Sequence, residues 1–104
     1  MPKSSQTRYA ALPFRRSRGR WEVLLITTRR SGRWIVPKGR AKNGCTPART
    51  AKIEAFEEAG VVGAVARKAI GSFEMKSRFA GPRVKASRIS VFPLAVRRQD
   101  ARWK

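Results

Sequence analysis

The sequence predicts a single α+β domain in which one helix packs against a sheet of several strands. The chain has 104 residues, a length that accommodates one domain. Hydrophobic residues make up 41% of the chain, which is enough for a folded core although 30% of the residues are charged. One segment carries helix-capping signals, and the other apolar stretches are short and strand-like. Several strands around one helix are typical of the α+β class.

The beginning of the chain predicts a tail and two strands. Residues 1–8 contain no apolar core and are expected to form a flexible basic tail, so that the domain spans residues 9–104. Residues 9–14 are a candidate strand, and a loop follows at 15–20, where serine and glycine interrupt the apolar pattern. Residues 21–28 form a near-continuous apolar run, which predicts a central strand buried on both faces.

A turn, a short strand and a loop lead to the helix. Residues 29–33 are expected to turn, because serine and glycine lie in their middle. A short strand at 34–36 is expected to end at Pro37, which cannot donate a hydrogen bond to a neighbouring strand. Residues 38–45 contain two glycines and mostly polar side chains, so we expect a loop there.

The helix is the element with the clearest boundaries. Thr46 suits the N-cap, and Pro47 suits the first helical position, where a missing N–H group costs nothing. Alanines favour the helix interior, and Gly60 is the expected residue just past its end.

Strands are also expected after the helix. Residues 61–70 and 72–76 alternate weakly, and residues 77–87 are rich in cations around a Gly-Pro pair, which predicts a mobile loop. Residues 88–96 are a final strand. Pro93 within it predicts an edge strand or a bulge.

The charge and the rare residue types limit the possible functions. A formal charge of +19 attracts polyanions, which include phosphorylated small molecules and nucleic acid. The chain has no histidine, which excludes imidazole zinc sites and Ser-His or Cys-His nucleophiles. Trp21 and Trp34 are expected in the core or at a sheet edge, with base stacking as the alternative.

No membrane segment or secretory signal is visible in the sequence. The first residues lack an apolar stretch, and the longest apolar run is too short to cross a bilayer. The expected location is the cytoplasm, with Cys45, the single cysteine, reduced.

Three of the six acidic residues lie within five positions of the helix. Glu54, Glu57 and Glu58 are related as i, i+3 and i+4, so they share one face. Glu54 and Glu58 repel each other, and the last turn of a helix favours cations over acids. A positive partner is therefore expected, and either neighbouring lysines and arginines or a hard divalent cation with oxygen ligands would serve. Lys38 and Arg40, in the loop before the helix, could bind phosphates.

Residues 39–61 resemble the signature of Nudix hydrolases, G-x5-E-x7-R-E-U-x-E-E-x-G-U, where U is aliphatic. The residues in register are Gly39, Glu54, Glu57, Glu58, Gly60 and Val61. The preceding W-x-x-P-K-G run, residues 34–39, resembles the branch that cleaves diphosphoinositol polyphosphates and diadenosine polyphosphates. The likeness extends over roughly residues 8–97 in pattern, and the signature is its specific part.

The resemblance implies an α/β/α sandwich with a mixed β-sheet, and metal-dependent hydrolysis of a phosphoanhydride bond in a nucleoside or inositol polyphosphate. It implies that Glu54, Glu57 and Glu58 bind Mg²⁺ or Mn²⁺, and that Glu54 and Glu57 are the catalytic candidates. The residues expected to bind substrate phosphates are Lys38, Gly39, Arg40 and Arg15. The C-terminal helix of the family is expected to be absent, so we expect a homodimer or low stability, since an apolar sheet face would otherwise be uncovered.

Two residues depart from the signature. Cys45 replaces its first glutamate, and Ile53 replaces its arginine, which normally orients a glutamate of the cluster. These departures favour a second hypothesis, in which the chain is a catalytically weak or inactive module that binds RNA or another polyanion.

Overall fold

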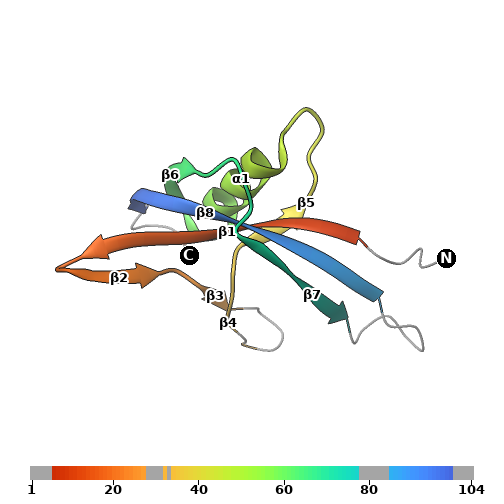
Figure 1. Ribbon diagram of the computed structural model, residues 1–104, viewed down its shortest axis with the longest axis horizontal. Helices are drawn as coiled ribbons and strands as arrows, with labels where there is room; N and C mark the ends of the chain where they lie inside the picture. The colour runs from red at the N-terminus through yellow and green to blue at the C-terminus, as the bar shows by residue number, and fades with distance from the viewer. Residues whose placement is uncertain (1–5, 28–31, 33, 78–84, 100–104) are drawn as a thin grey trace.

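The computed structural model describes residues 6–27, 32, 34–77 and 85–99, and shows a mixed sheet with one helix against it (Figure 1). The strand order is β2-β1-β8-β6, with β5 pairing β1 and β7 pairing β8, and β3 and β4 form a separate two-stranded sheet. The elements are β1 (Gln6–Ser17), β2 (Arg20–Val23), β3 (Ile26–Thr27), β4 (Trp34–Ile35), β5 (Lys38–Arg40), α1 (Pro47–Ala59), β6 (Val61–Val65), β7 (Gly71–Ser77) and β8 (Lys85–Gln99).

The two long strands β1 and β8 form the centre of the sheet. They run parallel, and their register extends from Gln6 opposite Ser87 to Phe14 opposite Ala95. The first strand therefore begins three residues before the predicted start, and residues 6–8 belong to the sheet rather than to a tail. Residues 1–5 lie outside the described part of the chain. Every other strand of this sheet pairs with β1 or β8, so these two strands position the rest.

The prediction of a central strand at residues 21–28 is wrong. Residues 20–23 form the edge strand β2, whose four residues are all exposed, and β3 is a separate two-residue strand. The cause is the turn that precedes it: Arg18 and Gly19 have φ of 52° and 79°, the left-handed values of a tight two-residue hairpin. This turn folds β2 back on the outer side of β1, where its apolar side chains remain accessible.

The prediction that Pro93 marks an edge strand or a bulge is also wrong, because β8 is central. On one side β8 pairs with β1. On the other side it pairs with β7 from Lys85 to Val91 and with β6 from Leu94 to Gln99. Pro93 lies at the interruption between β6 and β7, where its carbonyl accepts a hydrogen bond from Ala66 N–H at 2.9 Å. Its nitrogen faces the same interruption, so no neighbouring strand needs its missing N–H group.

Other boundaries also differ from the sequence prediction. The first strand continues to Ser17, so the loop expected at 15–20 is reduced to the turn at residues 18–19, and the final strand runs to Gln99. The strand expected at 61–70 ends at Val65, and the loop expected at 38–45 begins with the three-residue strand β5. In the segment 77–87, Ser77 and the residues from Lys85 onward are in strands, and 78–84 lie outside the described residues.

The helix has the predicted boundaries. The Thr46 side chain accepts a hydrogen bond from Arg49 N–H at 3.1 Å, and Gly60 ends the helix with a left-handed φ of 67°. An alanine stripe on α1 packs against Ala11, Phe92 and Leu94 of the central strands, and these residues form the core. The stripe is Ala48, Ala51, Ala55 and Ala59. In the described ranges, no helix is both long and apolar enough to span a membrane.

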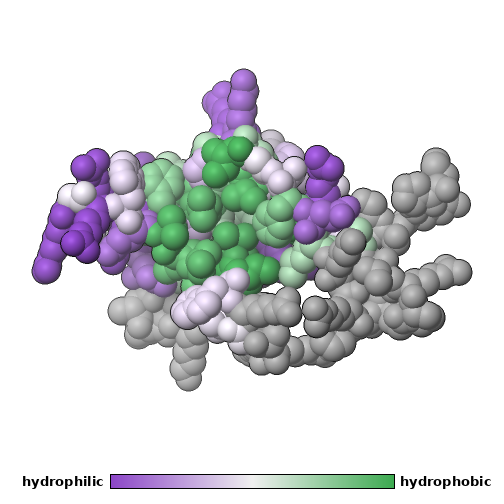
Figure 2. Space-filling view, turned by 60° about the horizontal axis from the view of Figure 1, so that its bottom comes forward, coloured by the Kyte–Doolittle hydropathy of each residue, from purple (hydrophilic) through white to green (hydrophobic). Residues whose placement is uncertain are grey.

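The sheet face opposite α1 is apolar and carries no second helix within the described residues. The register places Phe14, Val23, Phe73 and Ile89 on this face, of which Val23 is 56% and Phe73 is 42% exposed. Figure 2 shows a continuous hydrophobic area on one side of the molecule. The homodimer in which a second copy of the chain covers this face stays a prediction.

The close approach of β6 to β8 can be tested at Gly63. A Cβ atom there would overlap the carbonyl oxygen of Ala95 and crowd the side chain of Leu94, so Gly63→Ala forces the two strands apart. We expect this variant to lose about 1–3 kcal/mol of unfolding free energy in urea titrations. Gly71→Ala is the matched control, because a Cβ at Gly71 meets nothing within 4 Å. Equal stability of the two variants would contradict this packing.

Candidate metal centre

Strand β5 carries a glycine directly beneath the acidic face of α1. Gly39 pairs with Tyr9 of β1, and this register turns its Cα toward the helix. A Cβ atom at this position would overlap the carboxylate of Glu54. Glycine is therefore required for the Glu54 carboxylate to lie against β5, and the alanine stripe on α1 allows the helix to come this close to the sheet.

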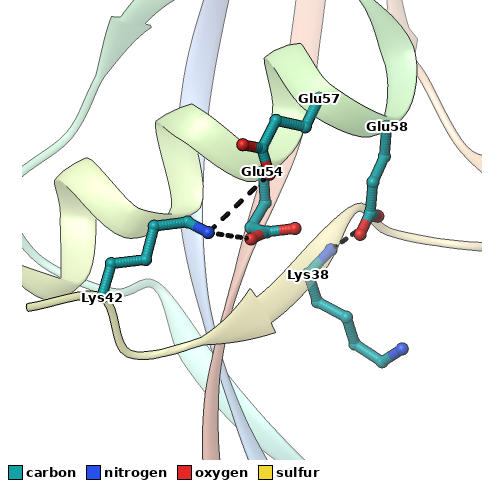
Figure 3. Close-up of polar contacts among 5 residues, drawn as sticks. All are labelled: Lys38, Lys42, Glu54, Glu57 and Glu58. Atoms are coloured by element: carbon teal, nitrogen blue, oxygen red, sulfur yellow. Dashed lines mark hydrogen bonds and ion pairs between the residues drawn. The ribbon is translucent and has the colours of Figure 1, made fainter.

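Two of the three carboxylates converge on one cationic group. The Lys42 ammonium, from the segment between β5 and α1, lies 2.9 Å from Glu54 Oε2 and 3.7 Å from Glu57 Oε1 (Figure 3). The Glu54 side chain is 9% exposed, whereas that of Glu57 is 55% exposed. A buried carboxylate needs a charged or hydrogen-bonding partner, and Lys42 provides it here. The pKa of Lys42 is raised, first by its hydrogen bond to Glu54.

The third carboxylate, on Glu58, points toward β5. Its Oε1 accepts a hydrogen bond from the backbone N–H of Lys38 at 3.1 Å. Burial, followed by a hydrogen bond with Glu54, raises the pKa of Glu58 to about 7. A carboxyl group with this pKa holds a proton in part of the molecules at neutral pH. A cation that binds its oxygens would displace this proton to solvent.

The predicted phosphate-binding residues do not all lie at this site. The backbone of Lys38 contacts Glu58, but its side chain points away from the three carboxylates (Figure 3). Burial and the neighbouring Arg8 lower the pKa of Lys38. Arg40 is exposed at the end of β5. Arg15 lies six residues along β1 from Tyr9, about 20 Å away at strand spacing, where it pairs with Glu22 at 2.7 Å. The structure therefore does not bring Arg15 to the carboxylates.

Lys42 was not among the predicted site residues. It lies in an irregular segment where no periodic pattern indicates its direction, and its charge is one of 25. The two residues that depart from the signature are Cys45, just before α1, and Ile53, within it. Cys45 closes a turn through its N–H, which donates to Lys42 C=O at 3.1 Å. Ile53 lies half-buried on α1, next to Glu54.

The residues present fit a hard divalent cation. Their donor atoms are carboxylate oxygens, the ligands that such cations prefer, and Glu54 and Glu57 already direct oxygens at a single positive charge. In the described part of the chain, no three acidic, cysteine or histidine side chains are gathered in the arrangement of a metal site. Glu58 accepts a hydrogen bond from the N–H of Lys38, and the Lys42 ammonium is paired with Glu54 and Glu57.

A mixed sheet whose strand–loop–helix unit places three glutamates of one helix beside a glycine defines a distinct class of domain. The NUDIX domain family model matches residues 5–102, so the chain belongs to this family. The family match covers both central strands and the whole candidate site.

The relatives include several hydrolases. The chain is 40% identical over 73 residues to diphosphoinositol polyphosphate phosphohydrolase 3-beta of Bos taurus, a match that covers 70% of this chain and 44% of that protein. The chain thus spans less than half the length of this curated relative. A Caenorhabditis elegans Ap4A hydrolase has the same fold, with a TM-score of 0.61 and 19% identity over 95% of this chain and 77% of that one. A MutT protein from Bacillus halodurans gives a TM-score of 0.62 with 24% identity, covering 86% and 56% of the two chains.

The raised pKa of Glu58 predicts a pH dependence of stability. The folded state keeps a proton on Glu58 up to about pH 7, whereas the unfolded state releases it near the ordinary value of 4.5. The stabilisation of the folded state by this proton is therefore fully present below pH 4.5, and it is lost as the pH rises from 4.5 to about 7. We expect Glu58→Gln to remove this part of the fall in unfolding free energy, measured by urea titration at several pH values in EDTA. Glu57→Gln should retain this fall. If the unfolding free energy of the two variants changed equally with pH, the assignment of this dependence to Glu58 would be contradicted.

Proposed function

We propose that the chain hydrolyses a phosphoanhydride bond in a nucleoside or inositol polyphosphate, with Mg²⁺ or Mn²⁺ as cofactor. The observation that carries the proposal is the position of the Lys42 ammonium. It lies 2.9 Å from Glu54 and 3.7 Å from Glu57, and this pairing supports a site in which both carboxylates bind one cation. Membership of the NUDIX domain family supports the reaction class.

Glu54, Glu57 and Glu58 are the residues that would hold the metal ion. A divalent ion at such a site polarises a phosphoryl oxygen and lowers the pKa of water. Glu54 is fixed by its burial against Gly39, so it holds its position while Glu57, which is largely exposed, can turn. Glu58 can join these two when its proton is released. Its pKa of about 7 makes this change favourable at neutral pH once a dication is near.

The catalytic candidates are Glu54 and Glu57. A general base must lie within hydrogen-bond reach of the attacking water, and Glu57 has the more accessible carboxylate of the two. Glu54 is the more rigid carboxylate and suits the orientation of a bound group. We propose that Lys38, Gly39 and Arg40 on β5 contact the phosphates of the substrate, because this strand borders the carboxylates directly.

The charge of the protein supports a multiply anionic substrate. With a formal charge of +19, the chain attracts polyphosphates over long distances and favours their encounter with the site. The names of two relatives, a diphosphoinositol polyphosphate phosphohydrolase and an Ap4A hydrolase, support substrates of this class.

Hydrolysis should depend on Glu57. With Mg²⁺ or Mn²⁺ and a panel of inositol pyrophosphates and dinucleoside polyphosphates, we expect Glu57→Gln to lower kcat by about 100-fold or more. Phosphate release is the measurement. Glu74→Gln, on exposed β7, removes the same charge away from the site and should leave the rate unchanged. Absence of turnover by the unmodified chain on every substrate would favour the hypothesis of an inactive polyanion-binding module.

Lys42 should compete with the metal ion. Its ammonium neutralises the same two carboxylates that would bind the dication, so Lys42→Met should bind Mn²⁺ several-fold more tightly. Calorimetry and the electron paramagnetic resonance signal of free Mn²⁺ measure this without substrate. The control is Lys52→Met, an exposed lysine of α1 with the same change in net charge. Equal Mn²⁺ affinity of the two variants would show that Lys42 does not occupy the position of the metal.

A further inference from the structure

The hairpin of β1 and β2 combines a dense positive charge with an exposed tryptophan. It projects at one end of the molecule, with its tip well separated from α1 (Figure 1). Four arginines lie at positions 15, 16, 18 and 20, and Glu22 is the one acid among residues 6–23. The charge is therefore concentrated in a few residues at the end of an extended element.

Among the residues that the structure describes, one of these four arginines forms an ion pair with an acid. The carboxylate of Glu22 pairs with Arg15 at 2.7 Å. Arg16, Arg18 and Arg20 are exposed, and Glu22 is the only acid of the hairpin's sequence. The turn residue Arg18 has a φ of 52°, in a tight turn that sets the register of the two strands. Arg16 lies on the face of the hairpin that carries Trp21, Arg18 lies in the turn, and Arg20 lies on the opposite face. Cations spread along a narrow ribbon suit successive phosphates of a polymer better than a single compact ion.

Trp21 is held in place although it is 64% exposed. Its ring lies against Phe14, with ring centroids 5.8 Å apart at 57°, and the guanidinium carbon of Arg16 is 5.1 Å from its centroid. Arg16 and Trp21 are directly opposite each other in the register of the hairpin. These contacts restrict the indole before any ligand arrives, so little side-chain entropy is lost when a planar group stacks on it.

We propose that the β1–β2 hairpin binds single-stranded nucleic acid, with Trp21 stacking on a base and with Arg16, on the same face, and Arg18, in the turn, contacting phosphates. Arginine and aromatic side chains alternating along a positive surface are the pattern that binds unpaired bases without sequence preference. An acidic protein would satisfy the arginines, but it offers no regular supply of flat rings for the indole. The surface is separate from the carboxylate site, because Arg15 lies six residues along β1 from Tyr9, the residue that pairs with Gly39 of β5.

Two probes with the same number of phosphates separate the contribution of base stacking to binding from the contribution of charge. One is a fluorescein-labelled 12-nucleotide oligothymidylate, and the other is an abasic strand of the same length. In fluorescence anisotropy, we expect Trp21→Ala to weaken binding of the oligothymidylate by about tenfold and to leave the abasic strand unaffected. Trp21→Phe retains a stacking ring and should restore most of the affinity, which also guards against misfolding of the alanine variant.

Trp34→Ala is the matched control for the tryptophan. Trp34 is 71% exposed, on β4, and its removal deletes the same side chain from another surface. The Trp34→Ala variant should bind both probes with the affinity of the unmodified chain. Equal losses in Trp21→Ala and Trp34→Ala, or a Trp21→Ala variant that binds both probes normally, would overturn the stacking contact.

The phosphate contacts have a salt-dependent signature. Replacing Arg16 and Arg18 together by alanine should weaken binding of both probes and reduce the slope of log affinity against log salt by about 1.4, since each single-strand phosphate contact contributes about 0.7. The control replaces Arg67 and Lys68, two exposed cations between β6 and β7, and should change the slope less. Equal slopes for the two double variants would show that the hairpin is not the binding surface.

Discussion

The close packing of α1 against the sheet is the constraint on which the candidate site depends. Alanines on the helix pack in the core, Gly39 on β5 carries no side chain, and the Glu54 carboxylate enters the space that a Cβ atom would fill. Larger residues at these positions would lift the helix and expose this carboxylate. The same small residues contribute little hydrophobic area, so the core relies on Phe92, Leu94 and Val61 for its buried apolar surface.

The acidic face of α1 is stabilised by different means at each carboxylate. Glu54 is paired with Lys42, Glu58 accepts the N–H of Lys38 and has a raised pKa, and Glu57 remains largely exposed. Three carboxylates in one place are unfavourable for one another, but a surrounding charge of +19 lowers that cost. The arrangement keeps oxygen ligands close together and leaves them exchangeable, which suits a site that binds and releases dications and phosphates.

The sequence predicted the elements whose signals are local. The capping residues Thr46 and Gly60 identified the helix, and the spacing of the acids identified their shared face. The order of the strands depends on partners far away in the chain, so the apolar run after Trp21 was wrongly placed at the centre, and Pro93 was wrongly placed at an edge. Lys42 could not be found for the same reason, since only the folded loop brings it to the helix.

The central pair of strands has a consequence for how the chain folds. β1 and β8 come from opposite ends of the described chain, with about eighty residues between paired positions. During synthesis, β1 therefore emerges long before its parallel neighbour exists, while the helix and the β1–β2 hairpin can form from local contacts alone. Closing so long a loop is entropically unfavourable and slow. Newly made molecules thus pass through a stage in which the apolar side chains of β1 lack their partner, and this stage is the one most exposed to aggregation and to protection by chaperones.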